Sequence, residues 1–234
     1  MYDVAAMSER RIVAAGLRCA CLLALLFGVI GCGTVTSTWP LRRGASSVNL
    51  SAGGPVANIG GFQLPIPYAV GRYRYGITDR VGAYATAHLL MAGFGVAGGD
   101  AGVTWHFVDQ HGLRPCIGMG AGAIGFAEFD GGSGRAFFPT AELTASYMRG
   151  RHSLTYAGVH GMLELDPLVH GTYTPYIGQE VNLGNRLSLN LELKWYGAWE
   201  RTKPRAVTYT MPIANHGGMG FAAGINYYFG SWYR

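Results

Sequence analysis

The chain has 234 residues, enough for one domain, with 37 glycines, 12% aromatic residues and a formal net charge of +5. Only 13% of its residues are charged, which is about half the usual share. Its basic residues are scattered and form no run or stripe, which argues against nucleic acid as a partner. A glycine-rich, aromatic-rich and charge-poor composition is typical of a β-barrel.

Residues 1–31 have the features of a secretory signal peptide. Three arginines precede an apolar run of about ten residues, Cys21–Ile30. A basic stretch followed by so short an apolar core is a targeting signal and not a membrane span. Translation from Met7 would give the signal a more usual length. We therefore expect residues 1–31 to be removed.

The signal ends in Val29-Ile30-Gly31-Cys32, which resembles the bacterial lipobox. This resemblance implies cleavage before Cys32 and attachment of lipid to it; the alternative is ordinary cleavage with Cys32 incidental. Gly33, in place of aspartate, implies no retention in the inner membrane. An acylated Cys32 cannot form a disulfide with Cys116, so no disulfide framework is expected. The polar residues 32–47 are interpreted as a tether.

Residues 48–234 are predicted to form an antiparallel, up-and-down transmembrane β-barrel. The clearest strand is Arg186–Tyr196, where leucine and then tryptophan at the odd positions alternate with polar residues or tyrosine. Eleven residues are enough for a tilted strand to cross a bilayer. We expect ten strands, at about 46–52, 68–76, 81–91, 102–108, 116–126, 138–148, 153–165, 172–181, 186–196 and 217–229. Eight is the alternative number, because the first strand is weakly defined and Pro175 interrupts the eighth.

The connections between these strands alternate in length. Four are tight turns, at 77–80, 109–112, 149–152 and 182–185, and those between them are longer and rich in glycine. Short periplasmic turns and longer external loops are typical of bacterial barrels. This alternation places both termini at the periplasmic side.

Aromatic residues fall near both ends of the expected strands, as in the two aromatic belts of a membrane barrel. A soluble sandwich core would place them at strand centres instead. A lipocalin-like soluble lipoprotein would have its apolar residues inside and its polar residues outside. The pattern here is the reverse, which favours an integral barrel of the bacterial outer membrane.

The last strand carries a further resemblance. Gly224, Tyr227 and Phe229 are similar to the C-terminal pattern by which the barrel assembly machinery recognises outer-membrane barrels. The sequence departs from that pattern at Ala222, where a polar residue is usual, and in the five residues that follow Phe229. The mature chain looks like the small bacterial outer-membrane β-barrels, with a lipoprotein signal added.

The same alternation predicts which charged side chains face the barrel interior. The expected lumen cluster consists of Arg72, Arg74, His88, His106, Glu142, Glu192 and Lys194. Ionisable groups in such a place must be paired or hydrated. We interpret them as ion pairs that fill a narrow barrel, with a narrow pore for small solutes as the alternative. Gly118, Gly120 and Gly122 would leave room for long side chains opposite.

The expected role is structural or surface-binding. Lipid-modifying outer-membrane barrels use a histidine followed two positions later by a serine, but His88, His106, His152 and His160 are followed by Leu90, Val108, Leu154 and Met162. We therefore expect no enzyme, and no cofactor or metal. The expected partners are outer-membrane lipid, the assembly machinery and lipopolysaccharide. The phosphates of lipopolysaccharide would meet Arg201, Lys203 and Arg205 in the longest loop; the alternative is that these residues lie in a solvated loop.

Overall fold

A computed structural model describes residues 35–36, 39–59, 62–65, 68–93, 95–129, 134–150, 152–165, 169–201 and 211–229. Within these ranges the chain forms eleven strands and one short helix. The elements are β1 (Ser46–Ile59), β2 (Phe62–Pro65), β3 (Ala69–Gly76), β4 (Val81–His88), α2 (Leu89–Ala92), β5 (Val96–Val108), β6 (Cys116–Glu128), β7 (Arg135–Arg149), β8 (Ser153–Glu164), β9 (His170–Asn182), β10 (Leu187–Arg201) and β11 (His216–Phe229).

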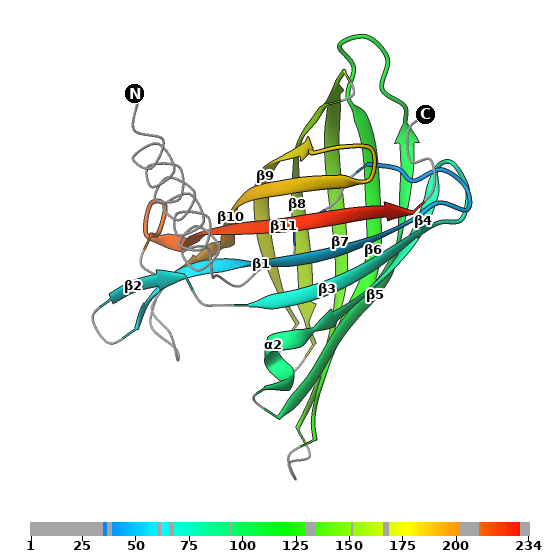
Figure 1. Ribbon diagram of the computed structural model, residues 1–234. Helices are drawn as coiled ribbons and strands as arrows, with labels where there is room; N and C mark the ends of the chain where they lie inside the picture. The colour runs from blue at the N-terminus through cyan, green and yellow to red at the C-terminus, as the bar shows by residue number, and fades with distance from the viewer. Residues whose placement is uncertain are drawn as a thin grey trace, which may run out of the picture.

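Ten of the strands form one closed antiparallel barrel (Figure 1). Each pairs with its neighbours in chain order, from β3 to β11, and β1 closes the ring by pairing with both β3 and β11. The seam joins Ser46 to Phe229 and continues to Pro55 and Gly220. The predicted all-β barrel of ten strands is therefore confirmed, and the alternative of eight is wrong. β2 pairs only with the far end of β1 and stands outside the ring.

The side chains alternate between the two faces of the wall as predicted. In β10, Ser188, Asn190 and Glu192 are buried inside, whereas Leu191 is 52% exposed outside. The outer surface is a sheath of exposed apolar side chains, including Leu50, Val103, Trp105, Met119, Leu143, Ile177, Phe221 and Ile225. A polar interior and an apolar exterior suit a barrel surrounded by lipid rather than water. No helix in the described ranges is long and apolar enough to span a membrane.

Several strand boundaries differ from the prediction, among them the following three. β1 continues to Ile59 and pairs with β2 where a loop was expected, and β5 begins at Val96 instead of residue 102. The β4 strand stops at His88, because residues 89–92 form α2. The added parts of β1 and β5 were missed because the glycines in them have no side chain to show which residues face inward and which face outward.

Pro175 lies inside β9 without breaking the barrel. The pairing between β10 and β9 reaches only from Ser188 with Asn182 to Lys194 with Tyr176. On its other side Pro175 is paired with Val159 of β8. The missing proline N–H thus falls where the ladder to β10 has already ended, so no hydrogen bond to β10 is lost.

Residues 35–36 and 39–41 of the predicted tether lie inside the barrel. Val35 is completely buried and Leu41 is 5% exposed. The Thr36 N–H donates to the Glu192 carboxylate at 2.8 Å, and the Arg74 guanidinium donates to the Trp39 carbonyl oxygen at 2.7 Å. A polar composition could not reveal this location, because the lumen of this barrel is itself polar. We call residues 35–36 and 39–45 the N-terminal segment.

Candidate functional site: a lumen closed at one end and hollow at the other

The two ends of the barrel are distinguished by their connections. Residues 77–80, 109–115, 150–152 and 183–186 link the strands at one end, which we call the tight-turn end. β1 begins and β11 finishes at this same end, because Ser46 pairs with Phe229. The opposite end, which carries α2 and the β1–β2 hairpin, is the loop end. The lumen differs sharply between the halves adjoining these two ends.

A dense hydrogen-bond network fills the tight-turn half of the lumen. The Glu180 carboxylate accepts hydrogen bonds from Ser188, from the Tyr228 hydroxyl and, at 3.1 Å, from the Asn226 amide. The same Asn226 amide donates to Asn190 Oδ1 at 2.8 Å. All five side chains are almost entirely buried. These side chains belong to β9, β10 and β11, so the network cross-links three neighbouring strands beside the seam.

Glu192 connects the wall to the N-terminal segment. Its carboxylate accepts hydrogen bonds from the Thr36 backbone N–H at 2.8 Å and from the Tyr156 hydroxyl at 2.9 Å. The Lys194 ammonium lies 2.6 Å from its other oxygen. The Glu192 side chain is fully buried and that of Lys194 is 6% exposed. A buried carboxylate with this set of partners fixes the segment in place.

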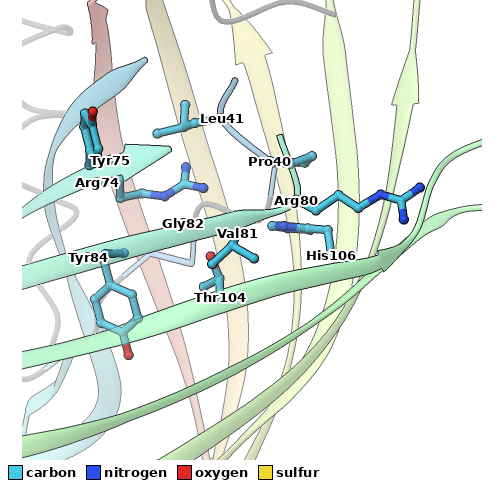
Figure 2. A pocket seen from close by; sticks show the side chains of 11 residues that line it. Pro40, Leu41, Arg74, Tyr75, Arg80, Val81, Gly82, Tyr84, Thr104 and His106 are labelled. Atoms are coloured by element: carbon cyan, nitrogen blue, oxygen red, sulfur yellow. The ribbon is translucent and has the colours of Figure 1, made fainter. Parts of the chain in front are cut away.

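Apolar contacts complete the closure of the tight-turn half. Leu41 and Ala45 form a buried cluster with Tyr228, and Leu154, Tyr156 and Tyr176 form a second one. Trp39 and Met148 pack against both. The pocket left between Leu41, Arg74 and His106 measures only about 10 Å³ (Figure 2), roughly one water molecule. The N-terminal segment thus acts as a plug in this half.

Glycines in the wall leave room for the lumenal tyrosines. A Cβ placed on Gly178 would lie 2.3 Å from the Tyr156 ring, and one on Gly158 would lie 2.5 Å from the Tyr176 hydroxyl. On the other side of the barrel, a Cβ on Gly122 would lie 2.7 Å from the Tyr84 hydroxyl. The expectation that Gly122 faces a long side chain agrees with this placement. Large rings can cross the lumen only because these positions lack side chains.

The loop half of the lumen is hollow and contains a cavity of about 520 Å³. Its lining combines aromatic and apolar side chains, such as Phe126, Phe138 and Met162, with charged ones. Thr36 of the N-terminal segment also lines it, so the segment forms part of its wall. A cavity of this size and mixed lining is typical of a small-molecule binding site.

One side of the cavity carries an interlocked set of polar groups. The Asp100 carboxylate lies 3.4 Å from the Arg72 guanidinium and 3.1 Å from His88 Nε2, and accepts a hydrogen bond from Thr86 at 3.0 Å. Arg72 Nε donates to the Thr86 hydroxyl at 2.8 Å, and its guanidinium lies 4.7 Å from the centre of the Tyr84 ring. These groups hold the arginine against the wall.

The seven charged residues predicted for the lumen do not form one cluster. Arg74 and His106 lie by the small pocket in the tight-turn half, and Glu192 holds the N-terminal segment. The other four, which line the large cavity, are Arg72, His88, Glu142 and Lys194. These charges were expected to form ion pairs that fill a narrow barrel. Within the described ranges, Lys194 pairs with Glu192 in the same strand, β10, and Asp100 of β5 pairs with Arg72 and lies beside His88.

The remaining predicted residues are placed as follows. Gly224 faces inward in β11, and Tyr227 and Phe229 lie outside, with ring centres 4.9 Å apart. Arg201 is the last residue of β10. Cys32, Lys203 and Arg205 lie outside the described residues.

Sequence reasoning missed Asp100, Glu180 and the N-terminal segment. Glu180 could have been found, because its neighbours Gln179 and Val181 face outward in the same alternation. Asp100 was assigned to a connecting loop, so its face could not be predicted. The N-terminal segment contains no periodic pattern, and its place in the lumen depends on contacts with strands far along the chain, such as that of Thr36 with Glu192, 156 residues away.

Among the described residues, no group of three or more histidine, cysteine, aspartate or glutamate side chains could hold a metal ion. No protein-family model and no characterised protein sequence matches the chain.

Several solved structures are similar in fold. An outer-membrane channel of Pseudomonas putida F1 is 10% identical over 84% of this chain and 100% of its own, with a TM-score of 0.48. The outer-membrane protease OmpT of Escherichia coli is 12% identical over 84% and 99%, with a TM-score of 0.41. The outer-membrane protein OprG of Pseudomonas aeruginosa is 11% identical over 82% and 98%, with a TM-score of 0.32. These likenesses concern the fold alone.

Proposed function

We propose that the protein is an integral β-barrel of the bacterial outer membrane that binds a small ligand through its loop end and does not conduct. The observation that carries this proposal is the contrast between the two halves of the lumen. The tight-turn half is filled by the N-terminal segment and the Glu180 network, whereas the loop half holds a cavity of about 520 Å³. A continuous pore requires both halves to be open.

The outer surface supports the membrane location. Exposed apolar side chains such as Leu50 (59%), Val103 (50%) and Ile177 (53%) occur on strands all around the barrel. A water-soluble monomer rarely exposes a continuous apolar surface of this extent. Strands such as β5, with 13 residues, exceed the roughly 9–11 needed to cross a bilayer at a tilt. The proposed orientation places the tight-turn end in the periplasm and the loop end outside the cell.

The proposed partners follow from this orientation. Trp199, near the loop end, is 72% exposed, and its ring centre lies 6.2 Å from that of Trp195. At this height on the barrel the two rings would contact the lipid headgroups. Arg201, Lys203 and Arg205 follow in the sequence and would pair with lipopolysaccharide phosphates. The assembly machinery would recognise Gly224, Tyr227 and Phe229 in the last strand. The proposed role includes no catalysis.

The conductance of the purified protein tests the proposal. In a planar lipid bilayer we expect little or no stable single-channel current from the wild type, because the N-terminal segment and the Glu180 network fill the tight-turn half and the pocket beside Leu41 and Arg74 holds about one water molecule. Insertion should be verified independently, by protease protection of the reconstituted protein. A steady, ion-selective current would contradict the proposal and favour a narrow pore.

We also propose that Cys32 carries lipid, on the strength of the lipobox-like Val29–Cys32. Metabolic labelling with a radioactive fatty acid should mark the wild type and leave Cys32→Ser unlabelled. Cys116→Ser is the matched control and should keep the label. Equal labelling of wild type and Cys32→Ser would show that Cys32 is not the acylated residue.

A further inference from the structure

The large cavity has two chemically different walls. Phe126, Phe138 and Met162 supply apolar and aromatic surface. Arg72, Asp100, Glu142, Lys194 and Glu200 supply charges, and the Glu200 carboxylate lies 3.0 Å from His170 Nε2. A ligand that fills this cavity must therefore have an apolar body and a polar group. The charge of that polar group must be opposite to whichever charge on the wall has no partner from the protein.

Both cations on the wall are already compensated by protein groups. The Lys194 ammonium lies 2.6 Å from the Glu192 carboxylate and 5.2 Å from the centre of the Tyr176 ring. The Arg72 guanidinium is held by Asp100 and lies over the Tyr84 ring. An anionic ligand would have to compete with these carboxylates for either cation.

Glu142 differs from the other charges of the cavity. Its Oε1 accepts a hydrogen bond from the Tyr176 hydroxyl at 2.6 Å, and its cross-strand neighbour is His160. In the described part of the chain, none of the ion pairs within 4 Å includes Glu142. The side chain is half-buried and lines the cavity, so a carboxylate without a cationic partner faces the space where a ligand would sit.

Aromatic rings extend from this carboxylate toward the loop end. The ring centres of Tyr68 and His88 are 5.2 Å apart, those of His88 and Phe126 are 5.2 Å apart, and those of Phe126 and Phe138 are 6.4 Å apart. Phe138 lies on the same strand and face as Glu142, four residues toward the loop end. Aromatic rings stabilise cations as well as apolar groups, and this lumen already places Arg72 and Lys194 over tyrosines.

We propose that the cavity binds a small organic cation, namely an ammonium group on an apolar or aromatic body. The ammonium would pair with Glu142, and the body would pack against Phe126, Phe138 and Met162. This inference rests on the ligand cavity of the proposed function and names its ligand class.

Calorimetric titration of the full mature protein in detergent tests this inference with three probes. Phenethylammonium should bind, whereas 3-phenylpropionate, with a similar body and the opposite charge, and ammonium chloride, without the body, should bind at least tenfold more weakly. Glu142→Gln should weaken phenethylammonium binding about tenfold or more, because a charge-assisted hydrogen bond is lost. Asp109→Asn, in a connection at the tight-turn end and outside the cavity lining, is the control and should leave the affinity unchanged.

A second variant keeps the test valid if Glu142→Gln does not fold. Phe138→Leu should weaken phenethylammonium binding without making phenylpropionate the better ligand, and ligand-induced shifts of the melting temperature provide an independent readout. Equal or tighter binding of phenylpropionate, full affinity in a folded Glu142→Gln variant, or binding of neither aromatic probe would each overturn the inference. If the barrel does not conduct and binds neither aromatic probe, the inference fails and the proposed function is unaffected. If the barrel conducts and binds phenethylammonium, the proposed function is contradicted and the inference is not.

Discussion

Replacing Glu192 with alanine is expected to lower the free energy of unfolding by about 3–5 kcal/mol, the typical cost of breaking a buried ion pair. The substitution removes the partner of Lys194, whose side chain is only 6% exposed, and leaves that ammonium uncompensated in the lumen. It also removes the acceptor for the Thr36 N–H and the Tyr156 hydroxyl. Urea unfolding of the folded protein in detergent, followed by tryptophan fluorescence, measures the change.

Two variants test whether the loss of stability comes from the broken ion pair or would follow from removal of any carboxylate in the barrel. Glu128→Ala, at the exposed end of β6, should change stability by less than about 0.5 kcal/mol. The double variant Glu192→Leu with Lys194→Met should be much more stable than Glu192→Ala, because removing both charges leaves neither unpaired. A loss below about 1 kcal/mol in Glu192→Ala would mean that water reaches the pair.

Deleting residues 35–41 is expected to turn a silent barrel into a conducting one. The deletion removes Trp39 and Leu41, which pack in the tight-turn half, and the backbone N–H that binds Glu192. The remaining turn keeps its own bonds, from Gly44 N–H to Gly76 and from Ala45 N–H to Arg42, so β1 can still begin at Ser46. Single-channel recording in a planar bilayer should show a steady current that the wild type lacks.

A conservative change in the same segment provides the control for this deletion. Trp39→Phe retains a ring between the two apolar clusters and should remain silent. If the deletion variant folds and is also silent, the side chains of the wall alone close the lumen, and the N-terminal segment contributes stability without blocking a pore.

The strands were predictable where polar and apolar side chains alternate. β10 and β11 show this alternation along most of their length, and the faces assigned to Glu192, Lys194, Tyr227 and Phe229 agree with their burial. Alternation reveals a face only where a side chain is present, so the glycine-rich starts of strands such as β5 were read as loops.

The arrangement inside the lumen was less predictable than the wall. Which inward charges meet depends on the register of strands far apart in the sequence, and on groups such as Asp100 that lie near strand ends. The hollow loop half depends on where large rings such as Phe126 and Tyr84 pack, which no local pattern encodes. A lumen filled throughout by ion pairs was expected; the observed lumen is filled by a segment of chain in one half only.

The lumenal N-terminal segment also bears on the order in which the barrel assembles. Its contacts near residue 44 are with the β1–β3 pair, from Gly44 to Gly76 and from Arg74 to Trp39, and these can form as soon as the first strands exist. The seam closes later, when residues such as Asn49 and Asn226, 177 positions apart, come together. Closure over so long a sequence separation is intrinsically slow. The early strands would therefore hold the segment on their concave face while the later strands curl around it, and the contact between Thr36 and Glu192 would form among the last.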